Sequence, residues 1–357
     1  MPRPDERDLI EVRPDERFDA IRLGRYLRDR LSGAHGEMSV RQFSGGKANL
    51  TYLLTFGESL EYVLRRPPLG DYAPSAHDMG RENRVLSVLR QAFPFAPRIY
   101  HYCEDEAVIG APFLIMERCR GVVVRDAMPE RFTGDRDAPQ QMSRALVDTL
   151  AAFHAVDYEA LGLSELGRPA GFILRQVEGW WRRWGAAALD DDPQVKQIYH
   201  WLADHLPESS YHSLVHNDYK LDNTMFDADD PARVVAILDW DMCTLGDPLS
   251  DVGTLLTYWT GPGDSAAVRA IGTMPAGDFN FYSRGQILQR YARQSGRDLS
   301  NMPFYHVLGI FRLLVILQQI YIRYVRGYTQ DKRFAQLNVS VDALTNWALE
   351  IMGESAG

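Results

Sequence analysis

Cysteine is rare in this chain of 357 residues, and long uncharged apolar runs are missing. The three cysteines stand far apart and form no C-x-x-C pair, which argues against a disulfide framework or a zinc site and favours a reducing cytoplasm. The most apolar stretch, residues 307–324, still contains two arginines and two glutamines, whereas a membrane span needs roughly 18 nearly uncharged residues. This stretch predicts a buried C-terminal helix and no membrane partner.

Positive charge is also in deficit. The net charge of −9 makes nucleic acid an unexpected partner, because a phosphate backbone is bound through a basic patch. Lysine is especially scarce, so arginine carries nearly all of the positive charge. The first seven residues carry charge but no apolar run, so no signal peptide is expected there. The length suffices for two lobes.

Residues 1–36 predict an N-terminal arm followed by a helix. The pentapeptide Arg3–Arg7 recurs as Arg13–Arg17, and two copies are too few for a repeat fold, so this part is interpreted as a solvated arm. Apolar residues at helical spacing then predict a helix over residues 18–31.

Residues 37–116 predict a small, mostly antiparallel sheet with one helix, over residues 78–93, lying across it. Short runs rich in β-forming residues support this prediction at residues 39–43, 51–56, 61–65, 97–102 and 112–116.

Residues 117–357 predict a larger helical lobe. The strongest helical patterns cover residues 143–156, 282–294 and 303–326, and two short apolar runs around a turn interrupt them at residues 213–251. A small β lobe followed by a helical lobe is a bilobal α+β architecture, and its active site is expected in the cleft.

The segment His216–Asn223 carries the strongest chemical signal, with the spacing H-x-D-x-x-x-x-N. Phosphoryl transfer needs a carboxylate that orients the attacking hydroxyl and accepts its proton, together with oxygen ligands for magnesium. Asp218 fits the first role, and Asn223 offers an uncharged oxygen ligand. His216 is interpreted as a support of the loop.

A second motif contains Asp239, which stands 16 residues after Asn223. The apolar run Val234–Leu238 ends in Asp239, which predicts a carboxylate at the end of a strand, suited to the main magnesium ligand. Gly246-Asp247-Pro248 then leads into a helix whose N-terminus Asp251 is expected to cap.

Together these motifs resemble the aminoglycoside phosphotransferase and choline kinase superfamily, whose signatures are H-x-D-x-x-x-x-N and D-W-x-x-x-x-x-G-D-P-x-x-D. The resemblance covers roughly residues 38–350. Ser44–Asn49, Tyr62–Pro68 and His216–Asn223 make the chain similar to the branch attached to some acyl-CoA dehydrogenases. The resemblance implies a protein-kinase-like fold, with ATP and Mg²⁺ as cofactors.

Residues of the β lobe are then expected to bind the nucleotide. Gly45, Gly46 and Asn49 lie between two strands, so that their backbone can cover phosphates, although an ordinary hairpin turn has the same pattern. Val63 and Arg65 share one face of a strand, where Val63 would touch adenine and Arg65 the phosphates.

Glu82 shares a helix face with Val85, Leu86 and Leu89, and a buried carboxylate needs a cation, for which Arg65 is the natural partner. This pair would stand in place of the lysine–glutamate pair of kinases. The alternative is a half-exposed Glu82 at the rim.

Three further features complete the predicted site. Met116 and Glu117 are expected to link the lobes and to offer backbone groups to the adenine edge. Lys220 would neutralise the transferred phosphoryl group, or be a surface lysine. The stripe Trp180–Trp184, with two arginines among its aromatics, would flank an anionic or acyl substrate or, more commonly, pack a helix.

The leading hypothesis is therefore an ATP- and Mg²⁺-dependent phosphotransferase that acts on a hydroxyl group of a small molecule. A hydroxylated acyl compound is one candidate acceptor, and a polycationic aminoglycoside is less favoured because no carboxylate-lined pocket is evident. The alternative is a nucleotide-binding pseudokinase with a regulatory or scaffolding role. Arg65 in the lysine position is its support, and the intact Asp218, Asn223 and Asp239 count against it.

Overall fold

The structure, a computed structural model, describes residues 8–44, 49–69, 78–208 and 211–355. The chain divides into two compact units, Met1–Val122 with Met225–Cys243, and Val123–Thr224 with Thr244–Gly357. The predicted α+β class is confirmed. The predicted boundaries after residues 36 and 116 stay a prediction, and the first unit also takes in a later segment that carries Asp239.

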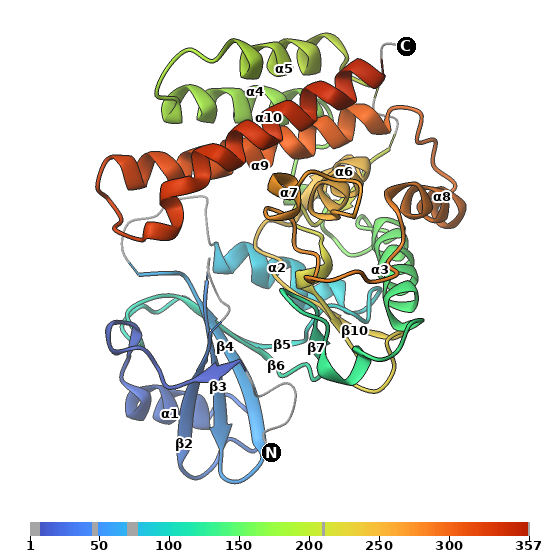
Figure 1. The fold of residues 1–357 in the computed structure, drawn as a ribbon. Coiled ribbons are helices and arrows are strands. Elements are labelled where there is room, and N and C mark those ends of the chain that lie inside the picture. Colours follow the sequence, from blue (N-terminus) through green and yellow to red (C-terminus); the bar gives the residue numbers. More distant parts are fainter. Residues whose placement is uncertain (1–7, 45–48, 70–77, 209–210, 356–357) are drawn as a thin grey trace. The chain divides into compact units, whose positions relative to one another are not determined.

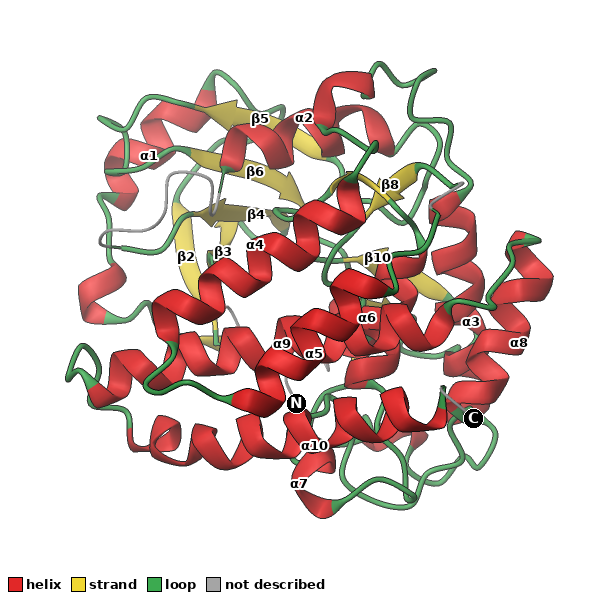
Figure 2. Ribbon diagram, turned by 90° about the horizontal axis from the view of Figure 1, so that it is seen from above, coloured by secondary structure: helices red, strands yellow, loops and turns green. Residues whose placement is uncertain are grey.

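A six-stranded antiparallel sheet dominates the first unit, in the order β1-β2-β3-β4-β6-β5 (Figure 2). The strands are β1 (Leu9–Ile10), β2 (Met38–Phe43), β3 (Leu50–Phe56), β4 (Leu60–Arg66), β5 (Ile99–Cys103) and β6 (Phe113–Glu117). The five strands predicted over residues 39–116 are therefore confirmed, because alternating β-formers can bury one face.

Helix α1 (Ala20–Arg28) covers one face of this sheet. Asp19 caps it by accepting a hydrogen bond from Arg22 N at 2.9 Å. Its fully buried Leu23 and Leu27 join a core that includes Tyr52 and Leu64 from the central strands. The predicted helix over residues 18–31 is confirmed, although α1 begins later and ends earlier than predicted.

Residues 13–17, interpreted as part of a solvated arm, contain no buried residue, but this turn is hydrogen bonded to the sheet. The carbonyl of Glu16 accepts hydrogen bonds from Tyr52 Oη at 2.9 Å and from Arg66 Nη2 at 2.8 Å, and Arg66 is only 2% exposed. A buried guanidinium needs acceptors, and this turn supplies one of them. The first copy of the pentapeptide, residues 3–7, lies outside the described residues.

Two smaller pieces complete the first unit. Helix α2 (Met79–Leu89) follows the N-cap Asp78, which accepts from Arg81 N at 3.0 Å. A three-stranded sheet has the order β10-β9-β7, with β7 (Val122–Val123), β9 (Thr224–Phe226) and β10 (Val234–Ile237). The ring of Trp240, just after β10, packs edge-on against Phe93, which follows α2 in the chain.

Helices make up most of the second unit. They are α3 (Ala138–His154), α4 (Phe172–Ala187), α5 (Pro193–Asp204), α6 (Leu249–Tyr258), α7 (Ala266–Arg269), α8 (Arg284–Ser295), α9 (Met302–Val325) and α10 (Leu337–Glu354). A short antiparallel pair, β8 (Ser213–Val215) with β11 (Thr244–Gly246), interrupts them. The sequence patterns predicted α3, α8 and α9 but did not single out α5 or α10.

Helix α9 is the central helix of this unit and packs against α10, α6 and α4 (Figure 1). By length and composition it could cross a membrane, yet 67% of its most apolar window is buried inside the protein. Glycines bring its backbone very close to α6, because a Cβ on Gly253 would lie 2.1 Å from the carbonyl oxygen of Tyr305. The predicted buried helix is confirmed.

His306 on α9 gives the second unit a pH-dependent stability. Burial, and to a smaller extent the charge of Arg284, lowers the pKa of His306 from 6.5 to about 3, and its Nε2 has no hydrogen-bond partner. The unfolded chain takes up a proton below about pH 6.5 and the folded chain does not. Stability is therefore full above that pH and falls as the pH is lowered.

Because of this histidine, we expect the free energy of unfolding to be about 2 kcal/mol lower at pH 5 than at pH 7. His306→Leu should flatten the pH dependence by that amount in urea denaturation. The exposed histidine variant His200→Leu is the control. Equal slopes for His306→Leu and wild type would show that His306 is charged in the folded protein.

Candidate active site

The predicted catalytic loop begins directly after β8, whose Leu214 and Val215 are fully buried. The loop ends in a 3-10 turn at Leu221–Asn223 and leads into β9. Asn217 adopts a left-handed backbone with φ of 64°, uncommon for a residue other than glycine. Such strained positions are held by their surroundings and cluster at functional sites.

Asp218 is held by two neighbours that the sequence motif also contains. Asn223 Nδ2 donates to the Asp218 carboxylate at 2.8 Å and to the Asp218 carbonyl at 2.8 Å. Lys220 Nζ lies 3.0 Å from the carboxylate and 4.7 Å from the centre of the Tyr258 ring. The side chain of Asp218 remains 20% exposed, so it is fixed in direction but still accessible.

Lys220 is partly buried beside this carboxylate. Burial lowers the pKa of Lys220, but the nearby Asp218, Tyr258 and Asp222 together offset burial and leave the pKa above its ordinary value. Lys220 is thus a fixed cation on the loop and no surface lysine, since its side chain is 15% exposed. His216 supports the loop as predicted, because its Nδ1 accepts from Asp218 N at 3.3 Å.

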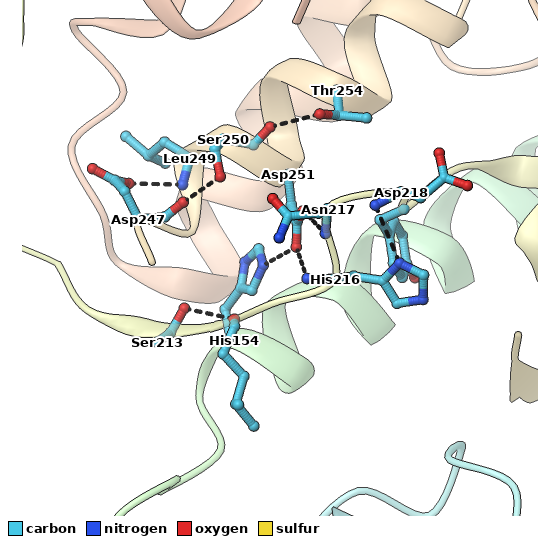
Figure 3. A network of polar contacts seen from close by, with 12 residues as sticks. His154, Ser213, His216, Asn217, Asp218, Asp247, Leu249, Ser250, Asp251 and Thr254 are labelled. Carbon is cyan, nitrogen blue, oxygen red and sulfur yellow. Dashed lines mark hydrogen bonds and ion pairs between the residues drawn. The ribbon is translucent and has the colours of Figure 1, made fainter. Parts of the chain in front are cut away.

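Asp251 does not cap α6, so that prediction is wrong. It is fully buried and accepts two hydrogen bonds from the loop, from His216 N at 2.6 Å and from Asn217 N at 2.7 Å (Figure 3). Asp247 instead accepts from Leu249 N at the start of the helix, at 2.9 Å. Asp251 therefore clamps the strained backbone next to Asp218, whose carboxylate points away from the clamp (Figure 3).

His154 is a member of this network that the sequence reading missed. Its Nε2 lies 3.2 Å from Asp251 Oδ2 and its Nδ1 lies 2.7 Å from Tyr291 Oη. Burial lowers the pKa of His154, against the opposing effect of Asp251, and so favours the neutral ring. Its place on the apolar face of α3, four residues after Leu150, was the available signal, since a buried polar side chain needs partners.

Asp251→Asn should destabilise the protein by about 2–4 kcal/mol, because an amide cannot accept from both backbone N–H groups as the carboxylate does. Asp148→Asn is the matched control. Asp148 pairs with Arg290 at 2.6 Å but is 38% exposed, so its loss should cost at most about 1 kcal/mol. Urea denaturation of both variants measures the difference; equal losses would show that the clamp contributes little.

The first unit contains the predicted ion pair between Arg65 and Glu82. Arg65 Nε lies 3.0 Å from Glu82 Oε2, although the alignment is not that of a hydrogen bond. Glu82 is only 1% exposed, so the predicted buried position is confirmed and the alternative of a half-exposed glutamate is wrong. Strand β4 carries Arg65 and helix α2 carries Glu82, and together they place one cation against one buried carboxylate.

Arg65 has two more carboxylate neighbours, which the sequence did not predict. It hydrogen bonds to Asp239 and lies 3.9 Å from Asp241. Asp239 follows β10 with a left-handed backbone, φ of 69°, which turns its side chain at the strand end. Asn49 Nδ2 donates to Asp241 at 2.9 Å, while Asn49 Oδ1 is buried without a hydrogen-bond partner.

The charges of this cluster shift one another. Burial lowers the pKa of Arg65, but Glu82, Asp239 and Asp241 together raise it above its ordinary value. Burial is also the largest influence on Glu82 and raises its pKa to about 7, against the opposing charge of Arg65. One arginine therefore serves three carboxylates, and the cluster can take further positive charge.

These residues fit magnesium by their chemistry. Mg²⁺ prefers carboxylate and amide oxygens, and the first unit offers Asp239, Asp241 and the unpartnered oxygen of Asn49. In the second unit, Asn223 uses its amide nitrogen for Asp218, which leaves its amide oxygen as a ligand.

The other predicted nucleotide contacts are placed as follows. Val63 pairs in register with Met116 in the sheet, and both are buried. Glu117 ends β6, where its N–H donates to Arg98 O at 2.8 Å, so this N–H is not available to an adenine edge. Gly45 and Gly46 lie outside the described residues.

Comparison with known proteins agrees with this fold. A model of the phosphotransferase enzyme family matches residues 39–284. A Ralstonia eutropha structure assigned as an aminoglycoside phosphotransferase is 30% identical, with a TM-score of 0.77, and 94% of this chain covers 99% of that chain. Choline kinase from Cryptosporidium parvum shares the fold at a TM-score of 0.60 and 10% identity, with 93% of this chain and 100% of that chain covered. The predicted protein-kinase-like fold is confirmed.

Among protein sequences, acyl-CoA dehydrogenase family member 11 of Pongo abelii is 35% identical over 336 residues, or 90% of this chain. Member 10 from Mus musculus is 33% identical over 91% of this chain. The chain spans only 42% and 30% of these two relatives. The predicted resemblance to this branch is confirmed, and the fold is that of small-molecule phosphotransferases. The chain belongs to the phosphotransferase enzyme family.

Proposed function

We propose that this protein transfers the γ-phosphoryl group of ATP to a hydroxyl group of a small molecule, with magnesium. The observation that carries the proposal is the arrangement around Asp218. Its carboxylate is accessible, fixed by Asn223 and Lys220, and attached to a strained backbone that Asp251 clamps. A general base must be directed in this way toward the proton that it accepts.

In this mechanism Asp218 receives the proton of the acceptor hydroxyl as its oxygen attacks the γ-phosphorus and ADP leaves. Lys220 places a fixed positive charge beside the base, where the transferred group is negative. Arg65 would hold the ATP phosphates with two donors and Glu82 would fix its direction. Asn223 and Asp239 would hold Mg²⁺, which neutralises phosphate charge when bound. Asn49 and the neighbouring Gly45 and Gly46 would cover the phosphates, with Val63 and Met116 at the adenine.

The acceptor is proposed from chemistry and from the relatives. The relatives are named as acyl-CoA dehydrogenase family members, which supports a hydroxylated acyl compound. The alternative, a pseudokinase, loses support because Arg65 keeps a cation paired with Glu82 and Asp239. A cytoplasmic location remains part of the proposal.

An ATP-consumption screen with magnesium over hydroxylated metabolites, including hydroxyacyl-CoAs, tests the proposal. Asp218→Asn run in parallel gives the background. We expect acceptor-dependent ADP formation by the wild type alone. ATP binding without any acceptor-dependent turnover would favour the pseudokinase.

Asp239→Ala should abolish the magnesium-dependent part of the thermal stabilisation by ATP, because the metal loses its best-placed carboxylate. The readout is the Tm with ATP alone and with ATP plus Mg²⁺. Asp227→Ala, which removes a half-buried carboxylate paired with Arg233 in the turn after β9, is the control. An unchanged magnesium-dependent shift in Asp239→Ala would place the metal on other residues.

A further inference from the structure

Three helices of the second unit line a small, partly open pocket. Helix α4 contributes Phe172, Gln176 and Trp180, which are spaced by four residues and therefore form one stripe. The pocket is much smaller than a typical ligand site, so it suits only one end group of a ligand whose remainder lies at its mouth.

The three tryptophans of α4, at positions 180, 181 and 184, have different roles. Trp184 is buried, and Trp181 stacks on Tyr199 of α5 at 4.4 Å between ring centres. Both serve helix packing, the more common role of such residues. Trp180 alone among these tryptophans lines the pocket, with its Nε1 donating to Gln176 at 3.3 Å.

The opposite walls come from α6 and α9. Ser250 and Thr254 face the pocket from α6, and Leu308 and Arg312 face it from α9. The two helices approach closely because Gly309, also a lining residue, has no side chain; a Cβ there would lie 2.7 Å from the carbonyl oxygen of Gly253. The close contact of α6 and α9 therefore shapes this side of the pocket.

The pocket has positive charge and no acidic lining residue among the described parts of the chain. The guanidinium of Arg312 lies 5.6 Å from the Trp180 ring centre, and Arg183 lies 4.4 Å from the same ring. Burial first, and then the like charges of Arg312 and Arg182, lower the pKa of Arg183. Arginines gathered around one ring favour an anion beside them.

The pocket also adjoins the predicted base. Asn217, the residue before Asp218, is part of its lining. On α6 the stripe Ser250–Thr254 continues, four residues on, to Tyr258, whose ring lies 4.7 Å from Lys220 Nζ. A group held in the pocket would therefore lie next to the loop that carries Asp218 and Lys220.

We propose that this pocket is the acceptor subsite and that Arg312 makes it selective for small hydroxylated compounds with an anionic group, of which a carboxylate is the simplest. This inference rests on the proposed function. The guanidinium of Arg312 binds the anion, Trp180 and Leu308 cover the apolar carbons, and the hydroxyl faces Asp218. Cationic acceptors such as aminoglycosides are repelled, because nothing in the lining balances their charge.

A binding experiment tests the pocket without any catalysis. Pentanoate, pentan-1-ol and pentylamine, added at equal ionic strength, probe an anion, a neutral molecule and a cation with one carbon skeleton. We expect only pentanoate to raise the Tm of the wild type and of Arg323→Gln, an exposed arginine variant on the same helix. Arg312→Gln should lose the shift and Arg312→Lys should keep part of it. Equal shifts with pentan-1-ol, or an unchanged shift in Arg312→Gln, would overturn the proposal.

A kinetic experiment then separates this inference from the proposed function. With 5-hydroxypentanoate, 1,5-pentanediol and 5-amino-1-pentanol as acceptors, we expect kcat/KM to be greatest for the hydroxy acid. Arg312→Gln should lower that value roughly 10- to 100-fold, the usual effect of losing a charged hydrogen bond, and lower the value for the diol much less. Phosphorylation without charge preference would overturn the Arg312 inference alone. Arg312-dependent pentanoate binding without any phosphorylation would support the pocket and count against the proposed function.

Discussion

Asp218→Asn is expected to lower kcat by about 10²- to 10⁴-fold while ATP binding stays nearly intact. Asparagine keeps the size of the side chain and can still contact Lys220 and Asn223, so the loop should hold its shape. What it loses is the ability to accept the proton of the attacking hydroxyl. The loss should therefore appear in kcat and hardly in the KM for ATP.

Steady-state kinetics with an accepted hydroxyl compound, together with ATP titration by thermal shift, measures both parts. Asp227→Asn, on the turn after β9, is the control for a neutralised carboxylate outside the loop. A variant that keeps more than half of the wild-type kcat would remove Asp218 from the mechanism.

Arg65→Ala should raise the KM for ATP, lower kcat and destabilise the fold together. Without the guanidinium, the buried Glu82 and the nearby Asp239 and Asp241 face one another without their shared cation. Breaking a buried ion pair on one side typically costs about 3–5 kcal/mol. The catalytic loss comes separately, because ATP loses both binding and alignment.

A double-mutant cycle with Glu82 separates the pair from its surroundings. Glu82→Ala should cost less than Arg65→Ala, and the double variant should cost less than the sum, because the two side chains act as one unit. Arg65→Lys should be a partial loss, since the charge remains but the two-point contact does not.

Kinetics on these four variants gives the coupling energy between Arg65 and Glu82 in catalysis, and urea denaturation gives their coupling energy in stability. A silent Arg65→Ala would show that another residue binds the phosphates, and Lys47, outside the described residues, is then the first candidate. Strict additivity would show that the contact with Glu82 has no functional weight.

Strands and the main motifs were readable from the sequence because their signals are local. Alternation of β-formers predicted β2 to β6, and a four-residue helical spacing put Glu82 on the buried face of α2. The spacing H-x-D-x-x-x-x-N predicted that Asp218 and Asn223 act together, and five residues of loop bring them to 2.8 Å.

Contacts between distant segments were not readable in the same way. Arg65 was matched with Glu82 but not with Asp239 and Asp241, which are more than 170 residues away in the chain. Asp251 looked like a helix cap because an aspartate in a first helical turn commonly is one. Its burial against β8, with His154 beside it, made it a clamp for the loop.

The sequence by itself determined the α+β class, the family resemblance and the residue types needed for phosphoryl transfer, because periodicity and motif spacing are properties of neighbouring residues. The tertiary structure alone decided which charges share Arg65, what holds the strained backbone at Asn217, and that Arg312 of α9 joins Trp180 of α4 at one pocket. These depend on long-range packing, where close approach of helices at Gly253 and Gly309 brings side chains together that no spacing in the sequence connects.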